Sequence, residues 1–380
     1  MSLSTKSELN LSPQKLKLLE LLLNEKRNQD KGAAKVIAIS PERRHFPVSF
    51  AQRRFWFLDR LTAGRGAYTI DKAVRLKGPL NVSALKQTLA EIQRRHESLR
   101  TTFEFIDDDL HQTIHPSGNI PLSVEDLSHL APLEQEEKVR SLAEAETDRP
   151  FDLARGPLLR FQLLLLSPCE YVLLLAMHHI ICDGWSIGVF VNELATLYEA
   201  FRLGRRSPLP ELKIQYADFI LWQRDYLSGG AGTRQRFYWK QKLEGLPPSL
   251  CLPADRPRST TRCLRGAMES IVLPAKLREA LLSFGREHEA TLFMVLLSAF
   301  NILLFRYTNQ GDFAVGSPIA NRRRSETEAL IGVFINTLVL RAKLERSLRV
   351  RDLVAQVRNT ALEAYTNQDM PFEELVADLN

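Results

Sequence analysis

The first apolar pattern along the chain is a stripe of four leucines at the spacing of one helical face: Leu16, Leu19, Leu22 and Leu23. Ser12 and Pro13 precede it, and these residue types are typical of a helix N-cap and of the first helical position. The polar residues 24–35 then predict a loop. We therefore interpret residues 1–45 as an N-terminal docking or linker segment with one short helix. The pattern leaves open whether this helix contacts a partner or packs on its own domain.

The chain that follows mixes helical and strand periods. Residues 83–96 predict a helix that begins with Ser83 as its cap. Two dense apolar runs, 158–166 and 171–178, are separated by a short turn-forming stretch and predict a hairpin of buried strands. Ser186 is the expected cap of a further helix, because apolar residues recur after it at helical spacing.

The second half of the chain repeats this mixture. Residues 291–306 predict an apolar, mostly buried helix. Residues 312–320 and 334–344 predict the strands that accompany it. The pattern as a whole predicts a mixed α/β (α+β) protein.

The length and the breaker residues predict two lobes. At 380 residues the chain is too long for one average core. Residues 203–212 and 228–233 are rich in glycine, proline and serine, and a lobe boundary is expected at one of them. We place the N-terminal lobe at residues 46–228 and the C-terminal lobe at residues 229–380.

Composition narrows the function classes. Hydrophobic residues make up 44% and charged residues 25%, which is typical of a globular protein. The net charge of +6 is mild, and the densest basic run, Arg322 to Arg324, has no interleaved aromatic residues. We therefore expect no nucleic-acid binding, although a basic face could help to dock an acidic protein partner.

The cysteines and the apolar runs indicate the cellular setting. Four cysteines are widely spaced and form no CxxC pair: Cys169, Cys182, Cys251 and Cys263. This spacing disfavours a zinc site or a disulfide framework and fits reduced thiols. No apolar run reaches the roughly 18 residues that a membrane span needs, and no signal-peptide pattern begins the chain. We therefore expect a cytoplasmic chain with no membrane contact.

Residues 176–185 place two histidines and an aspartate where the second predicted hairpin strand ends. His178 and His179 are neighbours, so on a strand they point to opposite faces, and one cleft can hardly use both. A histidine suits general-base work because its ordinary pKa lies near neutrality. Gly184 follows Asp183 and indicates a tight turn. We therefore expect Asp183 to form an ion pair that fixes the loop rather than to attack a substrate.

Other interpretations of this stretch stay open from the residues alone. The two histidines and Asp183 could bind a metal, although adjacent strand histidines diverge and no third group of ligands stands out. The histidine pair could be purely structural. Cys182 could be a nucleophile, although no basic neighbour is present to lower its pKa.

Residues 178–186, HHIICDGWS, resemble the HHxxxDG signature of nonribosomal peptide synthetase condensation domains. Acyltransferases that use coenzyme A share a shorter HxxxD core, so the other segments decide. Six of them match motifs of the family in the expected order: residues 49–58, 95–103, 149–160, 216–223, 331–341 and 367–376. The resemblance covers residues 46–380.

The resemblance implies a fold and a site. The fold would be two chloramphenicol-acetyltransferase-like lobes in a V-shaped pseudo-dimer, with the active site in a tunnel between them. His179 would face the tunnel as the catalytic residue, Arg322 would pair with Asp183, and Asn336 would lie beside the tunnel. The residues expected to support the active site are His178, Asp183, Gly184, Trp185, Arg322 and Asn336.

The resemblance also implies the chemistry. The amine of an acceptor aminoacyl thioester would attack the carbonyl of a donor acyl or peptidyl thioester. Both substrates would be held on the 4'-phosphopantetheine arms of carrier proteins, so no metal and no directly bound cofactor are expected. The implied partners are the donor and acceptor peptidyl carrier proteins and an adjacent adenylation domain in the parent synthetase. The motifs most resemble the group that joins an L-configured donor to an L-configured acceptor.

Alternatives from other function classes remain. The chain could be a non-catalytic platform that binds carrier proteins, or a free-standing acyltransferase that uses coenzyme A. In the condensation reaction itself, two roles of His179 stay open: it could act as a base, or as a hydrogen-bond partner of the amine.

The chain departs from the family pattern at two points. Asn367 stands where the family usually has a histidine. The sequence ends at Asn380, whereas family members continue with further strands and a helix, so we expect a truncated C-terminal lobe with an uncovered sheet edge and an uncertain turnover. The start at Met1, followed by the N-terminal helix, suggests that the donor carrier arrives from another polypeptide.

Overall fold

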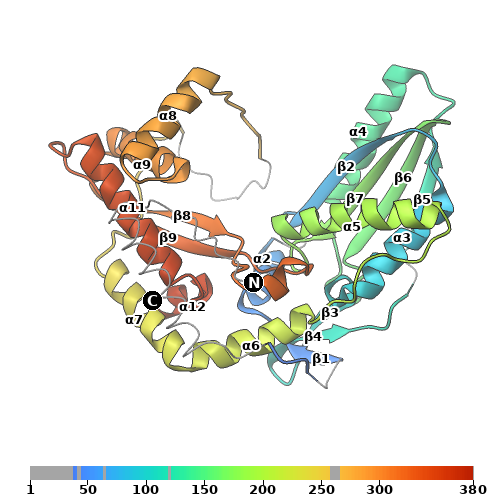
Figure 1. Cartoon of the computed structure of the whole chain (residues 1–380), viewed down its shortest axis with the longest axis horizontal. Helices are drawn as coiled ribbons and strands as arrows, with labels where there is room; N and C mark the ends of the chain where they lie inside the picture. Colours follow the sequence, from blue (N-terminus) through green and yellow to red (C-terminus); the bar gives the residue numbers. More distant parts are fainter. Residues whose placement is uncertain (1–36, 41–43, 63–65, 119–120, 257–265, 380) are drawn as a thin grey trace, which may run out of the picture. The chain divides into compact units, whose positions relative to one another are not determined.

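The computed structural model describes residues 37–40, 44–62, 66–118, 121–256 and 266–379 (Figure 1). The helix predicted around Leu16 to Leu23 lies outside the described residues. From Ser40 onward the chain forms one unit.

Two sheets are built from the first half of this unit. A three-stranded antiparallel sheet has the order β1-β4-β3, and a four-stranded sheet has the order β2-β7-β6-β5, in which β5 and β6 run parallel. The strands are β1 (His45–Pro47), β2 (Thr69–Lys77), β3 (Thr101–Ile106), β4 (Asp109–Ile114), β5 (Leu122–Asp126), β6 (Leu159–Ser167) and β7 (Glu170–His178).

Helices cover both faces of the four-stranded sheet (Figure 1). The helical segments of this half are α2 (Phe50–Leu61), α3 (Val82–Arg95), the 3₁₀ turn η1 (Glu97–Arg100), α4 (Pro132–Asp148), α5 (Gly184–Arg202) and α6 (Tyr216–Ser228). Residue Val139 of α4 packs in a cluster with Leu164 of β6, whereas the other face of the same strand carries Phe161, which stacks on Phe190 of α5. The predicted hairpin is thus confirmed as the antiparallel pair β6–β7, buried on both faces.

The helix caps differ from the predicted ones. Helix α3 is capped by Asn81 rather than Ser83, and α5 is capped by Asp183 rather than Ser186. Each first turn offers several polar residues, and the cap is the one whose backbone is still extended, as at Asp183 with φ −133° and ψ −177°. Asp183 and Gly184 therefore begin a helix and do not form the predicted tight turn.

The second half of the unit packs helices against a two-stranded antiparallel sheet, β8–β9. Its elements are α7 (Gly230–Leu243), α8 (Ala275–Glu287), α9 (Leu292–Thr308), β8 (Asp312–Ile319), α10 (Ser325–Glu328), β9 (Asn336–Lys343), α11 (Val350–Thr366) and α12 (Phe372–Leu379). The predicted strands at 312–320 and 334–344 are confirmed, and one apolar cluster joins α7, α9, α11 and both strands. Trp239 of α7 is its largest fully buried side chain.

Helices α6 and α7 meet at Gly229, inside the predicted breaker stretch 228–233. A Cβ at Gly232 would lie 1.9 Å from the carbonyl oxygen of Leu227, so only glycine allows this close approach of the two helices.

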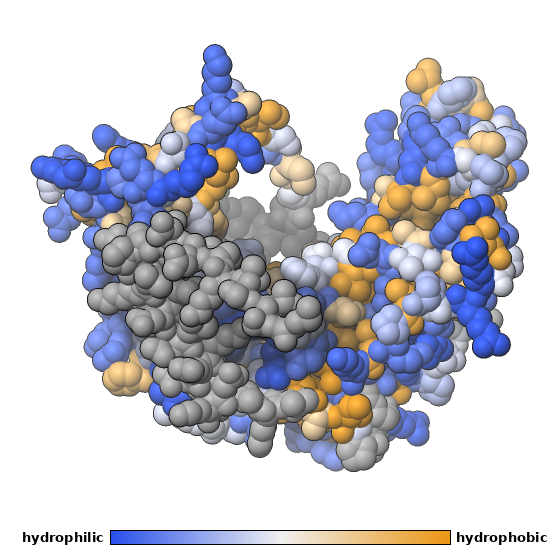
Figure 2. All heavy atoms as spheres, viewed as in Figure 1, coloured by the Kyte–Doolittle hydropathy of each residue, from blue (hydrophilic) through white to orange (hydrophobic). Residues whose placement is uncertain are grey.

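Helix α9 is apolar around most of its circumference but is not mostly buried, contrary to the prediction. Large side chains on one helical face are 41–64% exposed: Phe293, Leu296, Phe300, Leu303 and Tyr307. Figure 2 shows apolar side chains among charged ones in this region of the surface. Among the described helices none is by itself long and apolar enough to cross a membrane, although α8 and α9, bent by 101° at their junction, meet that test as a pair.

Candidate active site at the end of strand β7

His178 is the last residue of β7 and is buried. Its Nδ1 accepts a hydrogen bond from the backbone N–H of Ile180 at 3.1 Å, so the proton of the neutral ring lies on Nε2. This Nε2 is 3.4 Å from Oδ1 of Asp59 on α2, and the ring meets Phe151 edge to face. His178 therefore ties the turn that follows β7 to helix α2.

His179 follows as the first residue of this turn and is partly exposed. Its backbone N–H donates to the carbonyl of Tyr68 at 2.7 Å, and its ring stacks on Phe55 with centroids 4.4 Å apart and planes inclined by 15°. Burial lowers the pKa of His179 below its ordinary value, although the charge of Asp183 opposes this. The ring is thus neutral at neutral pH, and its buried Nδ1 has no hydrogen-bond partner among the described residues.

The predicted ion pair between Asp183 and Arg322 is confirmed, with Nη2 of Arg322 3.3 Å from Oδ1 of Asp183. Both side chains are almost fully buried. Burial lowers the pKa of Arg322, while the carboxylate of Asp183 raises it. The guanidinium also lies 3.9 Å above the ring of Phe334. The pair joins the start of α5 to the loop that follows β8.

Ser186 is central to the same contact, although the sequence indicated it only as a cap. Its Oγ lies within hydrogen-bond distance of the Asp183 carboxylate, of Arg322 Nη2, and of both the carbonyl and the N–H of Gly332. The other carboxylate oxygen of Asp183 accepts from the N–H of Phe334 at 2.9 Å. The backbone at residues 331–334 is thus held by side chains from α5.

A second buried network reaches this backbone from helix α3. His96 accepts from the N–H of Ile331 at 3.3 Å through Nδ1, and its Nε2 lies 3.0 Å from Glu193 of α5. Glu193 also forms a bidentate pair with Arg95. Burial alone would raise the pKa of Glu193, but the hydrogen bonds from His96 and Arg95 hold it below its ordinary value. No periodic pattern in the sequence indicated this network.

The remaining predicted support residues, Trp185, Gly184 and Asn336, have contacts of their own. Trp185 is about half exposed and donates from Nε1 to the carbonyl of Glu328 at 2.9 Å. Gly184 has open space where a Cβ would stand. Asn336 is buried and uses its whole amide on the backbone, donating to Gln368 and Met370 and accepting from residues 337 and 372. Asn336 thus fixes the connection between α11 and α12.

The structure also bears on the two other chemistries that the sequence left open, a Cys182 nucleophile and a metal site. Cys182 is fully buried, and burial raises the pKa of its thiol far above the ordinary value. Residues 37–379, outside their undescribed stretches, contain no group of three or more His, Cys, Asp or Glu side chains that could hold a metal ion.

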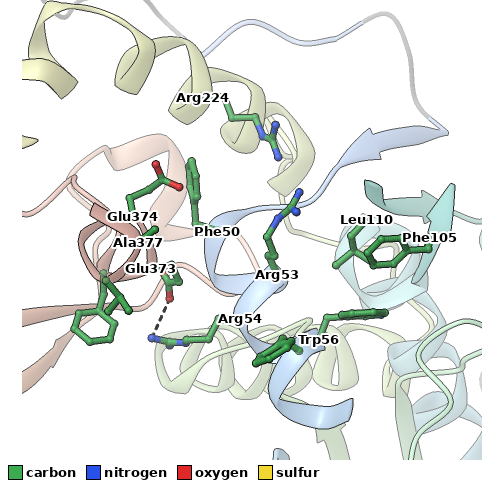
Figure 3. A pocket seen from close by; sticks show the side chains of 13 residues that line it. Phe50, Arg53, Arg54, Trp56, Phe105, Leu110, Arg224, Glu373, Glu374 and Ala377 are labelled. Atoms are coloured by element: carbon green, nitrogen blue, oxygen red, sulfur yellow. Dashed lines mark ion pairs between the residues drawn. The ribbon is translucent and has the colours of Figure 1, made fainter. Parts of the chain in front are cut away.

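A cavity of about 720 Å³ lies beside helix α2 (Figure 3). Phe50, Arg53 and Trp56 extend into it from α2, and residues of β3, β4, α6 and α12 complete its lining. The ion pair between Arg54 and Glu373, at 3.0 Å, joins α2 to α12 beside it. The cavity includes none of the residues of the HHxxxDG stretch.

Comparison with known proteins decides the family. The family model described as Condensation domain matches residues 42–380. The chain belongs to the condensation-domain family. The predicted family and the assignment to an acyltransferase-type enzyme domain are thereby confirmed.

The relatives of this condensation domain are much longer proteins. It is 51% identical over 339 residues to one of the proteins that make up the linear gramicidin synthase of Brevibacillus parabrevis, and the match covers 89% of this chain and 4% of that protein. It is 48% identical over 351 residues to another protein of the same synthase, covering 92% of this chain and 7% of that protein. The chain therefore spans less than a tenth of the length of these relatives.

Solved structures confirm the predicted mixed fold class. The X-domain from teicoplanin biosynthesis is 29% identical, with a TM-score of 0.81 over 90% of this chain and 76% of that one. The first condensation domain of the calcium-dependent antibiotic synthetase has a TM-score of 0.75 over 88% of this chain and 78% of that one, and at 22% identity it supports the fold alone.

Proposed function

We propose that this condensation domain joins a donor acyl or peptidyl thioester to the amine of an acceptor aminoacyl thioester, with His179 as the catalytic residue. The amine nitrogen attacks the thioester carbonyl, the carbon–sulfur bond breaks, and the thiol of the donor arm leaves. The observation that carries the proposal is a partly exposed imidazole, stacked on Phe55 at the end of β7 and with its pKa lowered by burial, within a chain of this family.

Positioning supplies most of the rate in such a reaction. An amine and a thioester held in near-attack geometry can gain on the order of 7–11 kcal/mol over free encounter. His179 adds about 10²–10⁴-fold, either by taking the proton that the amine loses or by orienting the amine through a hydrogen bond. The lowered pKa of His179 suits both roles, because each needs a ring nitrogen with a free lone pair.

The surrounding contacts support a fixed position for this ring. Asp183 caps α5, pairs with Arg322 and accepts from the backbone N–H of Phe334, so the turn after β7 is anchored on two sides. In the proposed mechanism Asp183 and Arg322 act as positioning residues, and so does Asn336 through the α11–α12 connection.

The proposed partners are a donor and an acceptor peptidyl carrier protein, with an adenylation domain adjacent in the parent synthetase. The substrates arrive on 4'-phosphopantetheine arms, so the domain itself binds no cofactor. The proposed stereochemical class is an L donor with an L acceptor. Because the relatives include proteins of linear gramicidin synthase, the proposed product is a peptide secondary metabolite of the antibiotic type.

The alternative of a binding role without catalysis is one that the experiment must separate from the proposal. One structure similar to this chain is a complex of the X-domain and OxyB from teicoplanin biosynthesis, at 28% identity and a TM-score of 0.81. In that complex a domain of similar fold binds OxyB. A carrier-binding role would likewise require this chain to bind another protein.

The test is to incubate the protein with one carrier loaded as donor and another loaded as acceptor, and to analyse the carriers by mass spectrometry. The proposal predicts an acceptor carrier that bears the condensed product, lost in His179→Ala and retained in the matched control His129→Ala, which changes an exposed histidine. Carrier binding without product would favour the platform. Turnover with an acyl-coenzyme A donor alone would favour the third alternative, a free-standing acyltransferase.

A further inference from the structure

Two side chains of helix α2 reach the two histidines of the candidate site. Phe55 stacks on the ring of His179, and Asp59 lies 3.4 Å from Nε2 of His178. Positions four residues apart in a helix lie on one face, so the helix presents both groups together. Phe55 is buried, and Asp59 is largely so.

The helix that carries them is itself held in place. Ser49 and Gln52 form a capping box at its start, and the hydroxyl of Tyr216 lies 2.9 Å from Ser49 Oγ while it also contacts the carbonyl of Val333 at 2.7 Å. The pair between Arg54 and Glu373 fixes its middle (Figure 3). Contacts made by α2 can therefore hold the histidines in one place.

Asp59 acts on the turn through the tautomer of His178. A carboxylate beside Nε2 favours the ring form that carries its proton there. This leaves Nδ1 free to accept from the N–H of Ile180, the bond that shapes the turn at residues 179–181. Without Asp59 the opposite tautomer becomes available, and it would place an N–H against another N–H.

Phe55 acts on His179 directly. The two rings are nearly parallel, so rotation of the imidazole about its side-chain bonds would lose the stacking contact. The phenyl ring also excludes water from one face of the imidazole. The ring of Tyr68 meets Phe55 edge to face at 5.6 Å, and its backbone carbonyl accepts from the backbone N–H of His179.

We propose that Phe55 and Asp59 form a positioning pair for the condensation reaction: Phe55 fixes the ring plane of His179, and Asp59 fixes the turn that carries it. The inference rests on the proposed function of His179. The charged and titratable groups that act on the pKa of that imidazole are Asp183 at the start of α5 and His178 on β7. Asp59 on α2 lies against the ring of His178 instead.

The test compares Phe55→Leu, Phe55→Tyr and Asp59→Ala with Phe57→Leu, a matched control on the exposed face of the same helix. Two readouts are measured: the titration and tautomer of both histidines by nuclear magnetic resonance, and the single-turnover condensation rate against pH. The control is expected to match the wild type in both.

Phe55→Leu is expected to move the titration midpoint of His179 upward, toward the ordinary value of 6.5, and to slow condensation by about tenfold to a hundredfold. Phe55→Tyr keeps the aromatic ring, so its titration midpoint for His179 and its condensation rate are expected to stay close to those of the wild type. Asp59→Ala is expected to shift the nitrogen signals of His178 toward a mixture of tautomers and to slow condensation similarly.

A folded Phe55→Leu protein with the wild-type midpoint and rate would overturn the role of Phe55, and an unchanged His178 tautomer in Asp59→Ala would overturn that of Asp59. A wild-type chain that forms no amide contradicts the proposed function instead. In that case the resonance measurements still decide whether the pair holds the histidines.

Discussion

Asp183 and Arg322 form a buried ion pair in which both groups have further partners. The carboxylate accepts from Ser186 and Phe334, and the guanidinium donates to the carbonyls of Thr327 and Leu330. A buried charge that loses its partner keeps its desolvation cost without compensation. At the scale of single residues, this pair is therefore the most sensitive electrostatic contact of the site.

Asp183→Ala is expected to lower the free energy of unfolding by about 3–5 kcal/mol, because it leaves Arg322 buried without a counter-charge. Denaturant unfolding measures this. The control is Glu211→Ala, which removes an exposed partner of Arg94 and is expected to cost less than about 1 kcal/mol. Similar losses in the two variants would contradict the importance of the buried pair.

The pH dependence of the rate follows from His179. Its pKa in the folded chain lies below the ordinary value of 6.5, so the neutral ring persists as the pH falls through 6.5. As the pH falls below 6.5, His179 is protonated in the unfolded chain before it is protonated in the folded one. His179 therefore lowers the free energy of unfolding below this pH and has no such effect above it. The acidic limb of the single-turnover rate is therefore expected below pH 6.5. A limb centred above the ordinary value would argue against His179 as the titrating group.

The chain between α10 and β9 is the element that connects the two halves at the site. Its backbone at residues 331–334 is bonded by His96, Ser186, Asp183 and Tyr216, which belong to α5, α6 and the end of α3. A Cβ at Gly332 would lie 2.3 Å from the ring of Tyr216. Glycine is thus required for this element to reach its partners.

Gly332→Ala is expected to lower the free energy of unfolding by about 1–3 kcal/mol, because the added methyl group forces the segment away from the Tyr216 ring. The matched control is Gly188→Ala within α5, where nothing lies within 4 Å of the added atom. That change is expected to stabilise the helix by about 0.5–1 kcal/mol. The measurement is thermal or denaturant unfolding, and equal effects would be evidence against the close contact.

At the scale of secondary-structure elements, the apolar and turn patterns of the sequence predicted several strands correctly. The β6–β7 hairpin and the strands β8 and β9 follow from apolar runs and turn residues, and the structure contains them. The caps at Asn81 and Asp183 were predicted two and three residues later, at Ser83 and Ser186, because several polar side chains compete in a first turn. The exposed face of α9 was not predicted, since an all-round apolar helix does not reveal which side is covered.

The site depends on contacts between distant parts of the sequence. Asp183 and Arg322 were paired from the family resemblance and not from spacing. The roles of Ser186, Tyr216 and the His96–Glu193 network were missed, because polar contacts between residues far apart in the sequence leave no periodic trace. For the whole molecule, the apolar pattern predicted the mixed fold class, whereas the arrangement as two chloramphenicol-acetyltransferase-like lobes was predicted only from the family motifs.

The four-stranded sheet and the β8–β9 sheet differ in how completely their strands are paired. Strand β7 has a neighbour on each side, β2 and β6, whereas β9 pairs only with β8 among the described residues. In an antiparallel ladder, a strand with one neighbour has about half of its N–H groups outside the ladder. The backbone amides of β9 are therefore expected to be less protected against hydrogen exchange than those of β7.

Amide hydrogen exchange is expected to be faster in β9 than in β7, because unpaired and edge amides open at lower free energy. Helix α11 packs beside β9 and serves as the control, since its amides are bonded within the helix. Mass spectrometry of exchanged peptides measures all three. Equal protection of β7 and β9 would show that the β8–β9 pair is stabilised by more than its own ladder.

The most direct test of a catalytic His179 is the single-turnover condensation rate of His179→Ala with both loaded carriers at saturation. The rate is expected to fall by about 10²–10⁴-fold, with carrier affinity and the free energy of unfolding close to those of the wild type. A His179→Ala protein that condenses at the wild-type rate, while a stably folded His178→Ala does not, would assign the chemistry to the other histidine.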